Sequence, residues 1–115
     1  MPHKIEPYLW DILSAGEEIL SFTSGKTLGE YKGDRLLQLG MERCFITIGE
    51  AMVRIRMGHP SEFDMLPEAR KVVDLRNLLT HQYDAVSDED VWNIIQVHLQ
   101  PLLREVQILL NRIKV

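Results

Sequence analysis

Cysteine, aromatic side chains and long apolar runs are all scarce in this chain, and each scarcity excludes a class of protein. A single cysteine, Cys44, cannot form an internal disulfide, and its place in an apolar helical pattern favours a core position over a nucleophile. No apolar run approaches the roughly 20 residues that a membrane span needs. The first residues, Met-Pro-His-Lys-Ile-Glu-Pro, carry no apolar segment after their charge, so we expect no signal peptide and a cytoplasmic protein.

Residues that could hold a metal ion are also few and badly spaced. The histidines at positions 3, 59, 81 and 98 show no metal-ligand spacing among themselves or with Cys44. We therefore expect neither a metal site nor a cofactor, so any chemistry would depend on protein side chains alone.

Positive charge is in short supply, since the formal net charge is −4. This balance argues against broad, sequence-independent binding of nucleic acid, which a strongly basic surface would drive. A local site remains possible. If RNA is the substrate, we expect a confined cleft in which a few arginines and lysines focus the field, with a basic patch from Arg54 and Arg56 nearby.

Apolar residues recur at helical spacing over most of the chain, and no strand pattern occurs. The periodicity predicts helices over residues 5–23, 34–57, 67–83 and 91–114, with a linker over 59–66. Pro101 interrupts the last helix and should kink it, because proline removes a backbone hydrogen bond and clashes with the preceding turn. A chain of 115 residues with an ordinary 45% of hydrophobic residues should form one domain, residues 1–115. The expected fold is all-α, an up-down four-helix bundle.

Short polar motifs mark where these helices begin. Thr27 and Ser87 each open a capping-box pattern, and Asp34 offers a clean start for the long helix over residues 34–57. Inside that helix, Gly40 and Gly49 cost stability relative to alanine. They therefore indicate the close approach of another backbone, either within the fold or across a dimer interface.

Two acids of the same helix, Glu42 and Glu50, lie eight residues apart on nearly one face. Such acids are usually solvated or paired at the surface. A carboxylate at either position could instead orient Arg76 or His81.

The segment from Arg76 to Tyr83 is the place where a cation, an imidazole and a phenol lie within about two helical turns of each other. On an ideal helix Arg76 and Tyr83 share one stripe, and Asn77 can reach His81 one turn later. Arg76 and His81 point roughly 140° apart, so one helix does not aim both at a small target. A second copy of the chain could supply the missing half.

A purely structural interpretation of the same residues is available. Arg76 would then be a surface ion-pair partner, His81 a favourable charge at a helix C-terminus, and Tyr83 a residue at the edge of the core.

The pattern Arg76-Asn77, three residues, His81, one residue, Tyr83 resembles the signature of the HEPN superfamily. Its context is similar to the HepT branch, the toxin partner of a minimal nucleotidyltransferase antitoxin. The resemblance covers most of the chain, including the flanking segments 41–51 and 91–101, which support it by order and spacing.

The resemblance implies a homodimeric, HEPN-like bundle that acts as the toxin of a type II/VII-like toxin-antitoxin system. It implies a metal-independent RNA endonuclease that leaves 2′,3′-cyclic phosphate ends. Arg76 would hold the scissile phosphate, His81 would act as general acid or base, and Asn77 would orient His81 or the phosphate. The nucleotidyltransferase antitoxin would silence the enzyme by attaching AMP to Tyr83.

A different class of function uses the same residues. A non-catalytic helical module could bind a nucleotide or a nucleotidyltransferase partner through Arg76 and Tyr83 without cutting RNA. Loss of host toxicity in His81→Ala would support only the nuclease.

Overall fold

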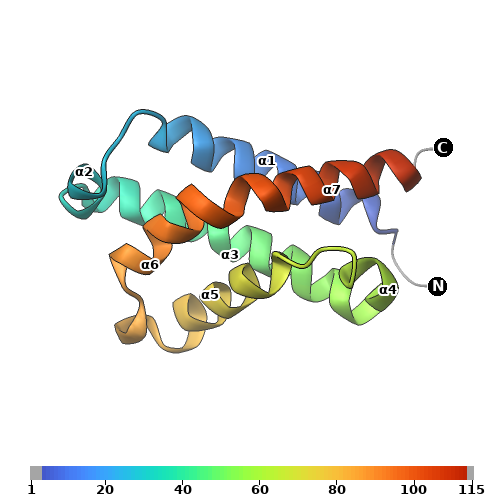
Figure 1. The fold of residues 1–115 in the computed structure, drawn as a ribbon. Coiled ribbons are helices and arrows are strands. Elements are labelled where there is room, and N and C mark those ends of the chain that lie inside the picture. Colours follow the sequence, from blue (N-terminus) through green and yellow to red (C-terminus); the bar gives the residue numbers. More distant parts are fainter. Residues whose placement is uncertain (1–3, 114–115) are drawn as a thin grey trace.

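The computed structural model describes residues 4–113, and helices account for most of them (Figure 1). The two longest helices, α1 and α3, are followed by α5 and by a nearly continuous helical run that ends the chain. The elements are α1 (Glu6–Thr23), α2 (Leu28–Lys32), α3 (Arg35–Gly58), α4 (Pro60–Phe63), α5 (Ala69–His81), the 3-10 turn η1 (Tyr83–Ala85), α6 (Asp88–Asn93), the π-helical turn η2 (Ile94–His98) and α7 (Leu99–Ile113).

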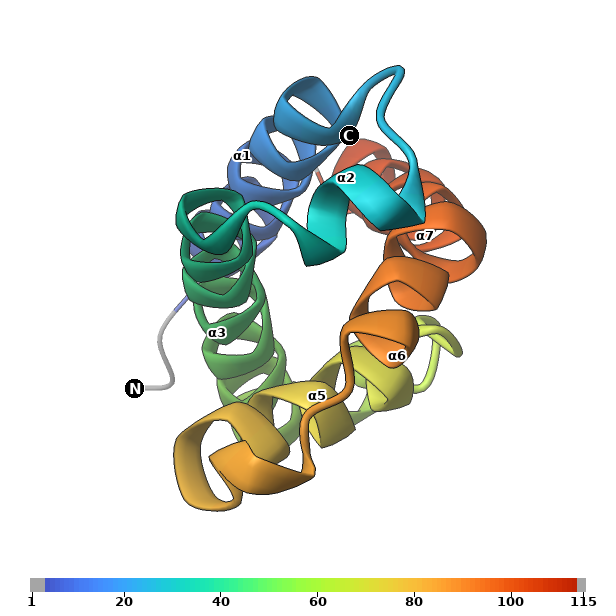
Figure 2. The ribbon, with the colours of Figure 1, turned by 90° about the vertical axis from the view of Figure 1, so that its left-hand side faces the viewer.

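Helix α3 is central to the arrangement, because it packs against α1 on one side and α5 on the other. Figure 2 looks along the bundle and shows α1, α3, α5 and the α6–α7 run on its different sides, with α2 across one end. No strand occurs within residues 4–113, so the all-α prediction is confirmed there. The up-down bundle type, the homodimer and the single domain stay predictions.

The predicted helix starts at Thr27 and Asp34 are confirmed, because each side chain caps the backbone that follows it. The Thr27 hydroxyl accepts from the Glu30 amide, and the Glu30 carboxylate accepts in return from the Thr27 amide, which completes a capping box. Asp34 accepts from the Leu37 amide at the start of α3. Between these helices and α1, Gly25 adopts a φ of 73°, which side chains disfavour.

The region from residue 59 to 68 differs from the prediction. Helix α5 begins at Ala69 and not at Pro67, and the expected linker contains the short helix α4. Phe63 and Leu66 are buried there, so this segment folds back to cover the core. Proline at the first position of α4 suits a helix start, because its missing N–H would have no partner in the helix.

The last helical run begins at Asp88, capped by the Ser87 hydroxyl, and continues through η2 to Ile113. The π-helical turn stands directly before Pro101, and the Leu99 amide bonds back to the Ile94 carbonyl. Such turns allow a helix to absorb a local change of hydrogen-bond register. The kink at Pro101 stays a prediction, and Lys114 lies outside the described residues.

The core is made by apolar side chains that the periodicity had placed on inner faces, such as Leu9, Ile12 and Ile48. Complete burial of a side chain of this kind contributes about 1.5–3 kcal/mol to folding. The Cys44 thiol is partly buried, and burial raises its pKa, which favours packing over nucleophilic chemistry. Within residues 4–113, no helix combines the length and apolar character that a membrane crossing requires.

Candidate functional site

Arg76 sits where α5 crosses α3, directly over Gly49. A β-carbon added to Gly49 would lie 2.3 Å from Cβ of Arg76 and 2.6 Å from its Cγ, too close for any side chain. The predicted close approach at Gly49 is therefore confirmed within the fold, with the stem of Arg76 as the neighbour. Gly40 differs, because an added β-carbon there would have no other residue within 4 Å.

The Arg76 side chain continues from this crossing into an open groove of about 690 Å³. The groove lies between the start of α1, the C-terminal half of α3 and α5. Its lining residues are Tyr8, Glu50, Val53, Arg54, Met57, Gly58, His59 and Arg76. Two arginines thus face one carboxylate in a confined space, although the chain as a whole is acidic.

The polar atoms of Arg76 are only partly satisfied. Nη1 donates to Oδ1 of the adjacent Asn77 at 3.0 Å, while Nε is buried and has no hydrogen-bond partner. Asn77 therefore orients the guanidinium of Arg76. The sequence had placed the Asn77 amide within reach of His81 instead. A buried donor without an acceptor is uncommon, and an anion in the groove would offer the guanidinium acceptors.

His81 is the last residue of α5 and is exposed. It does not line the groove that holds Arg76. Because both residues lie on the regular helix α5, their side chains leave it in directions roughly 140° apart.

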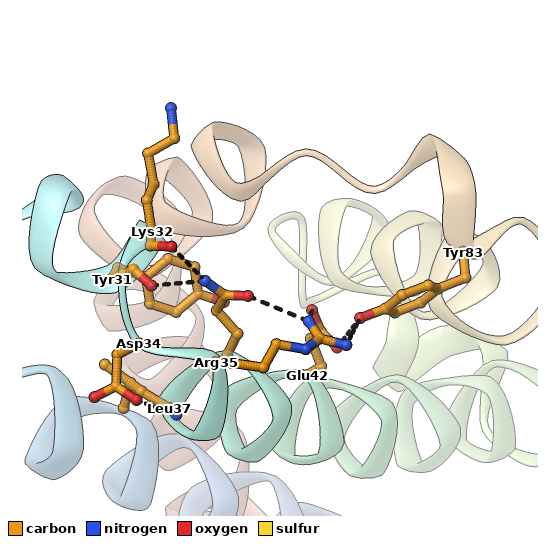
Figure 3. A network of polar contacts seen from close by, with 8 residues as sticks. Tyr31, Lys32, Asp34, Arg35, Leu37, Glu42 and Tyr83 are labelled. Carbon is orange, nitrogen blue, oxygen red and sulfur yellow. Dashed lines mark hydrogen bonds and ion pairs between the residues drawn. The ribbon is translucent and has the colours of Figure 1, made fainter.

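Tyr83 is held at the other end of the same helix pair (Figure 3). Its hydroxyl donates to Oε1 of Glu42 at 2.7 Å and accepts from Nη2 of Arg35 at 2.9 Å. The Arg35 guanidinium also lies 5.9 Å from the centre of the Tyr83 ring, and 4.0 Å separates its Nη1 from Oε2 of Glu42. We call these three residues the Tyr83 clamp.

Glu42 is the buried member of the clamp, with 6% of its surface exposed, whereas Tyr83 keeps 44%. The Glu42 carboxylate accepts a hydrogen bond from Tyr83, and its possible role in orienting Arg76 or His81 stays a prediction. Glu50, the other acid considered, does line the groove beside Arg76.

Arg35 is the site residue that sequence reasoning missed. Its signal was its position seven residues before Glu42, which places both on one face of α3. Without a known partner for Glu42, that spacing looked like any other pair of surface charges.

The expected basic patch of Arg54 and Arg56 is divided in the structure. Arg54 lines the groove with Arg76. Arg56 instead lies over the Phe63 ring at 5.9 Å, as does Arg70 at 5.8 Å. Among residues 4–113, no group of three or more histidine, cysteine or acidic side chains is placed to hold a metal ion.

The fold and the groove define an all-helical protein with an arginine-lined surface suited to a phosphate-bearing ligand. The family model for ribonuclease HepT-like proteins matches residues 12–109, so the chain belongs to the ribonuclease HepT-like family. The resemblance drawn from the sequence is thereby confirmed.

Relatives in the archaeon Methanocaldococcus jannaschii carry names that mark them as candidate RNases. One, MJ1380, is 26% identical over 104 residues, which cover 90% of this chain and 94% of the relative. Another, MJ1216, is 25% identical over 115 residues, covering 99% of this chain and 94% of the relative. No solved structure matches the chain significantly.

Proposed function

We propose that this protein is a metal-independent endoribonuclease that leaves 2′,3′-cyclic phosphate and 5′-hydroxyl ends. The observation that carries the proposal is the placement of Arg76, whose stem is packed on Gly49 and whose side chain lines the groove. A preorganised guanidinium stabilises the extra charge of a pentavalent phosphate without having to reorient during the reaction. Membership of the ribonuclease HepT-like family supplies the reaction class.

RNA brings its own nucleophile, so the reaction needs only proton transfer and charge stabilisation. In the proposed step His81 accepts the proton of the 2′-hydroxyl, and the 2′-oxygen attacks the adjacent phosphorus. The bond from phosphorus to the 5′-oxygen breaks, and that oxygen takes a proton from a second acid. Arg76 holds the phosphate, and Asn77 fixes the guanidinium through its hydrogen bond. DNA should resist, because it lacks the 2′-hydroxyl.

A homodimer is part of the proposal, because Arg76 and His81 do not share one site within a chain. A two-fold axis would bring the Arg76 grooves and the exposed His81 side chains of both copies to one cleft. The second imidazole would also serve as the acid for the leaving oxygen.

We further propose that the protein is the toxin of a toxin-antitoxin pair and that a nucleotidyltransferase antitoxin silences it by attaching AMP to Tyr83. The exposed ring makes the residue accessible to a modifying enzyme. Attachment replaces the hydroxyl donor with a phosphate beside the buried Glu42 carboxylate, and like charges at that distance repel. The clamp must then open, with Arg35, and not Arg76, as the cation nearest to the new phosphate.

The decisive experiment is cleavage of a defined RNA in EDTA by the purified wild-type protein, Arg76→Ala and His81→Ala. We expect cutting by the wild type, new ends that carry cyclic phosphate, and a loss of at least about 100-fold in each variant. Arg56→Ala is the matched control, because it removes an arginine that lies on Phe63. Intact RNA with a folded, dimeric, unmodified wild-type protein would overturn the catalytic proposal in favour of a non-catalytic binding module.

A further inference from the structure

The groove that contains Arg76 has two chemically different walls. Arg54, Arg76 and Glu50 supply charge, whereas Tyr8, Val53 and Met57 supply an apolar surface. Met57 is 80% exposed, so its apolar side chain is available to a ligand in the groove.

We propose that this groove holds a nucleotide next to the scissile phosphate, with its base against Tyr8 and Met57 and its phosphate on Arg54. The inference rests on the proposed function, and it names two residues outside the Arg-Asn-His-Tyr motif as determinants of RNA binding. Both come from parts of the chain far from the motif, Tyr8 from α1 and Arg54 from α3.

The size and chemistry of the groove fit a nucleotide. A volume of about 690 Å³ lies within the roughly 300–1,000 Å³ usual for small-molecule sites. Proteins that bind single-stranded nucleic acid combine cations that follow the backbone with aromatic rings on which bases stack. Tyr8 and His59 both contribute rings to the lining of this groove, and the two arginines provide the cations.

Glu50 limits what else the groove can take. Its carboxylate accepts hydrogen bonds, so it suits a ribose hydroxyl or an amino group of a base, but it repels a second phosphate close to the first. The presence of Glu50 in the groove therefore favours a nucleotide of an RNA strand over a compact polyanion such as a triphosphate.

Arg54 and Arg56 provide an internal comparison, since they stand two residues apart on the same helix. Arg54 lines the groove, and Arg56 lies over Phe63. Removal of either one changes the net charge equally, so a difference between the two variants reports the position of the charge and not its amount.

The test measures binding of a fluorescent 2′-O-methyl RNA hexanucleotide, which cannot be cut through a 2′-hydroxyl, by fluorescence anisotropy. We expect Kd to rise about tenfold in Arg54→Ala and in Tyr8→Leu, as loss of a phosphate contact or of a stacked base predicts. Tyr8→Phe keeps the ring, and Arg56→Ala keeps the groove, so both should bind within about twofold of the wild type. Far-UV circular dichroism verifies that each variant is folded.

Several outcomes would overturn the inference. The first is failure of the wild-type protein to bind the hexanucleotide. The second is wild-type affinity in Arg54→Ala and Tyr8→Leu. The third is a loss of affinity in Arg56→Ala equal to that in Arg54→Ala. A further control adds AMP or an unlabelled RNA dinucleotide as a competitor. If AMP displaces the hexanucleotide at the same concentration as the dinucleotide, the groove is a site for free nucleotides and the inference is wrong.

This binding test and the cleavage assay in EDTA, run on the same variants, together separate the inference from the proposed catalysis. Groove-dependent binding by a wild-type protein that leaves RNA intact in EDTA would keep the nucleotide site and reject the nuclease. Cutting of RNA with an unchanged KM in Arg54→Ala and Tyr8→Leu would keep the nuclease and reject the site.

Discussion

Arg76 and Tyr83 lie near opposite ends of the contact between α3 and α5, and their polar groups have opposite surroundings. At one end, Arg76 packs its stem on Gly49, keeps an unpaired Nε and faces an open groove. At the other end, the Tyr83 hydroxyl both donates to Glu42 and accepts from Arg35. The two contacts are seven residues apart in both segments, from Glu42 to Gly49 within α3 and from Arg76 in α5 to Tyr83 in η1, just beyond the end of that helix.

The difference shows how one antiparallel helix pair can expose a cation and restrain a phenol. Because Gly49 has no side chain, the arginine stem packs against it, and the guanidinium has Asn77 as an acceptor at Nη1 but none at Nε. A buried carboxylate at Glu42 gives the tyrosine a partner that it would lose on modification. Each end can be altered separately, which provides direct tests of the comparison.

The largest effect on stability is expected from Gly49→Ala. The new methyl group would meet the stem of Arg76 at 2.3 Å, and helix α5 would have to shift away. We expect the free energy of unfolding to fall by about 2–3 kcal/mol, the upper part of the range for overpacked cores. Urea denaturation measures this change, and RNA cleavage should fall with it, because Arg76 loses its position.

Gly40→Ala is the matched control on the same helix. It has space for a methyl group and should raise the free energy of unfolding by about 0.5–1 kcal/mol, the helix preference for alanine over glycine. Equal effects of the two substitutions would show that the Gly49 crossing has no special role.

An intermediate effect is expected from Tyr83→Phe, which leaves the buried Glu42 carboxylate without its hydroxyl donor. We expect a loss of about 1–2 kcal/mol in the free energy of unfolding. A double-mutant cycle with Glu42→Gln should give a coupling energy of about 1 kcal/mol. Additive effects of the two substitutions would show that the clamp does not form in solution.

The smallest effect is expected from Tyr31→Phe. The Tyr31 hydroxyl is buried without a hydrogen-bond partner, in contrast to that of Tyr83, so its removal should change stability at pH 7 by less than about 0.5 kcal/mol. Burial, and then the charge of Glu42, raises the pKa of Tyr31 above its ordinary value of 10.0.

Because the pKa of Tyr31 is raised, the difference in stability between the wild type and Tyr31→Phe depends on pH. Above pH 10 the phenol ionises in the unfolded chain before it does so in the folded one, and wild-type stability falls. Tyr31→Phe lacks this group and should lose less stability between pH 9 and about 11, measured by urea denaturation at each pH. An identical decline in both proteins would exclude Tyr31 as a source of it.

Local signals in the sequence were enough to find most helix boundaries. Thr27, Asp34 and Ser87 act on amides three residues ahead, so their effect depends little on the rest of the fold. The start of α5 was placed two residues early, at Pro67, and α4 was missed. Burial of Phe63 and Leu66 against distant helices decides that segment, and no local pattern reveals it.

For the candidate site, too, some features could be predicted from the sequence and others depend on the tertiary structure. The sequence alone indicated which side chains could carry chemistry, because the spacing of Arg76, Asn77 and His81 on a helix follows from backbone geometry. The helix predicted over 67–83 was too long at its C-terminal end, since α5 ends at His81 and Tyr83 lies in η1. The sequence also indicated that Arg76 and His81 diverge, and His81 does not line the groove that holds Arg76.

Only the tertiary structure decided the partners of those residues. It brought Glu42 and Arg35 to Tyr83, placed Arg54 beside Arg76, and turned Arg56 onto Phe63. The physical reason is that helix periodicity fixes the face on which a residue lies, whereas the register between two packed helices is set by long-range burial and close packing. In this protein a glycine at one crossing and a buried acid at the next set that register.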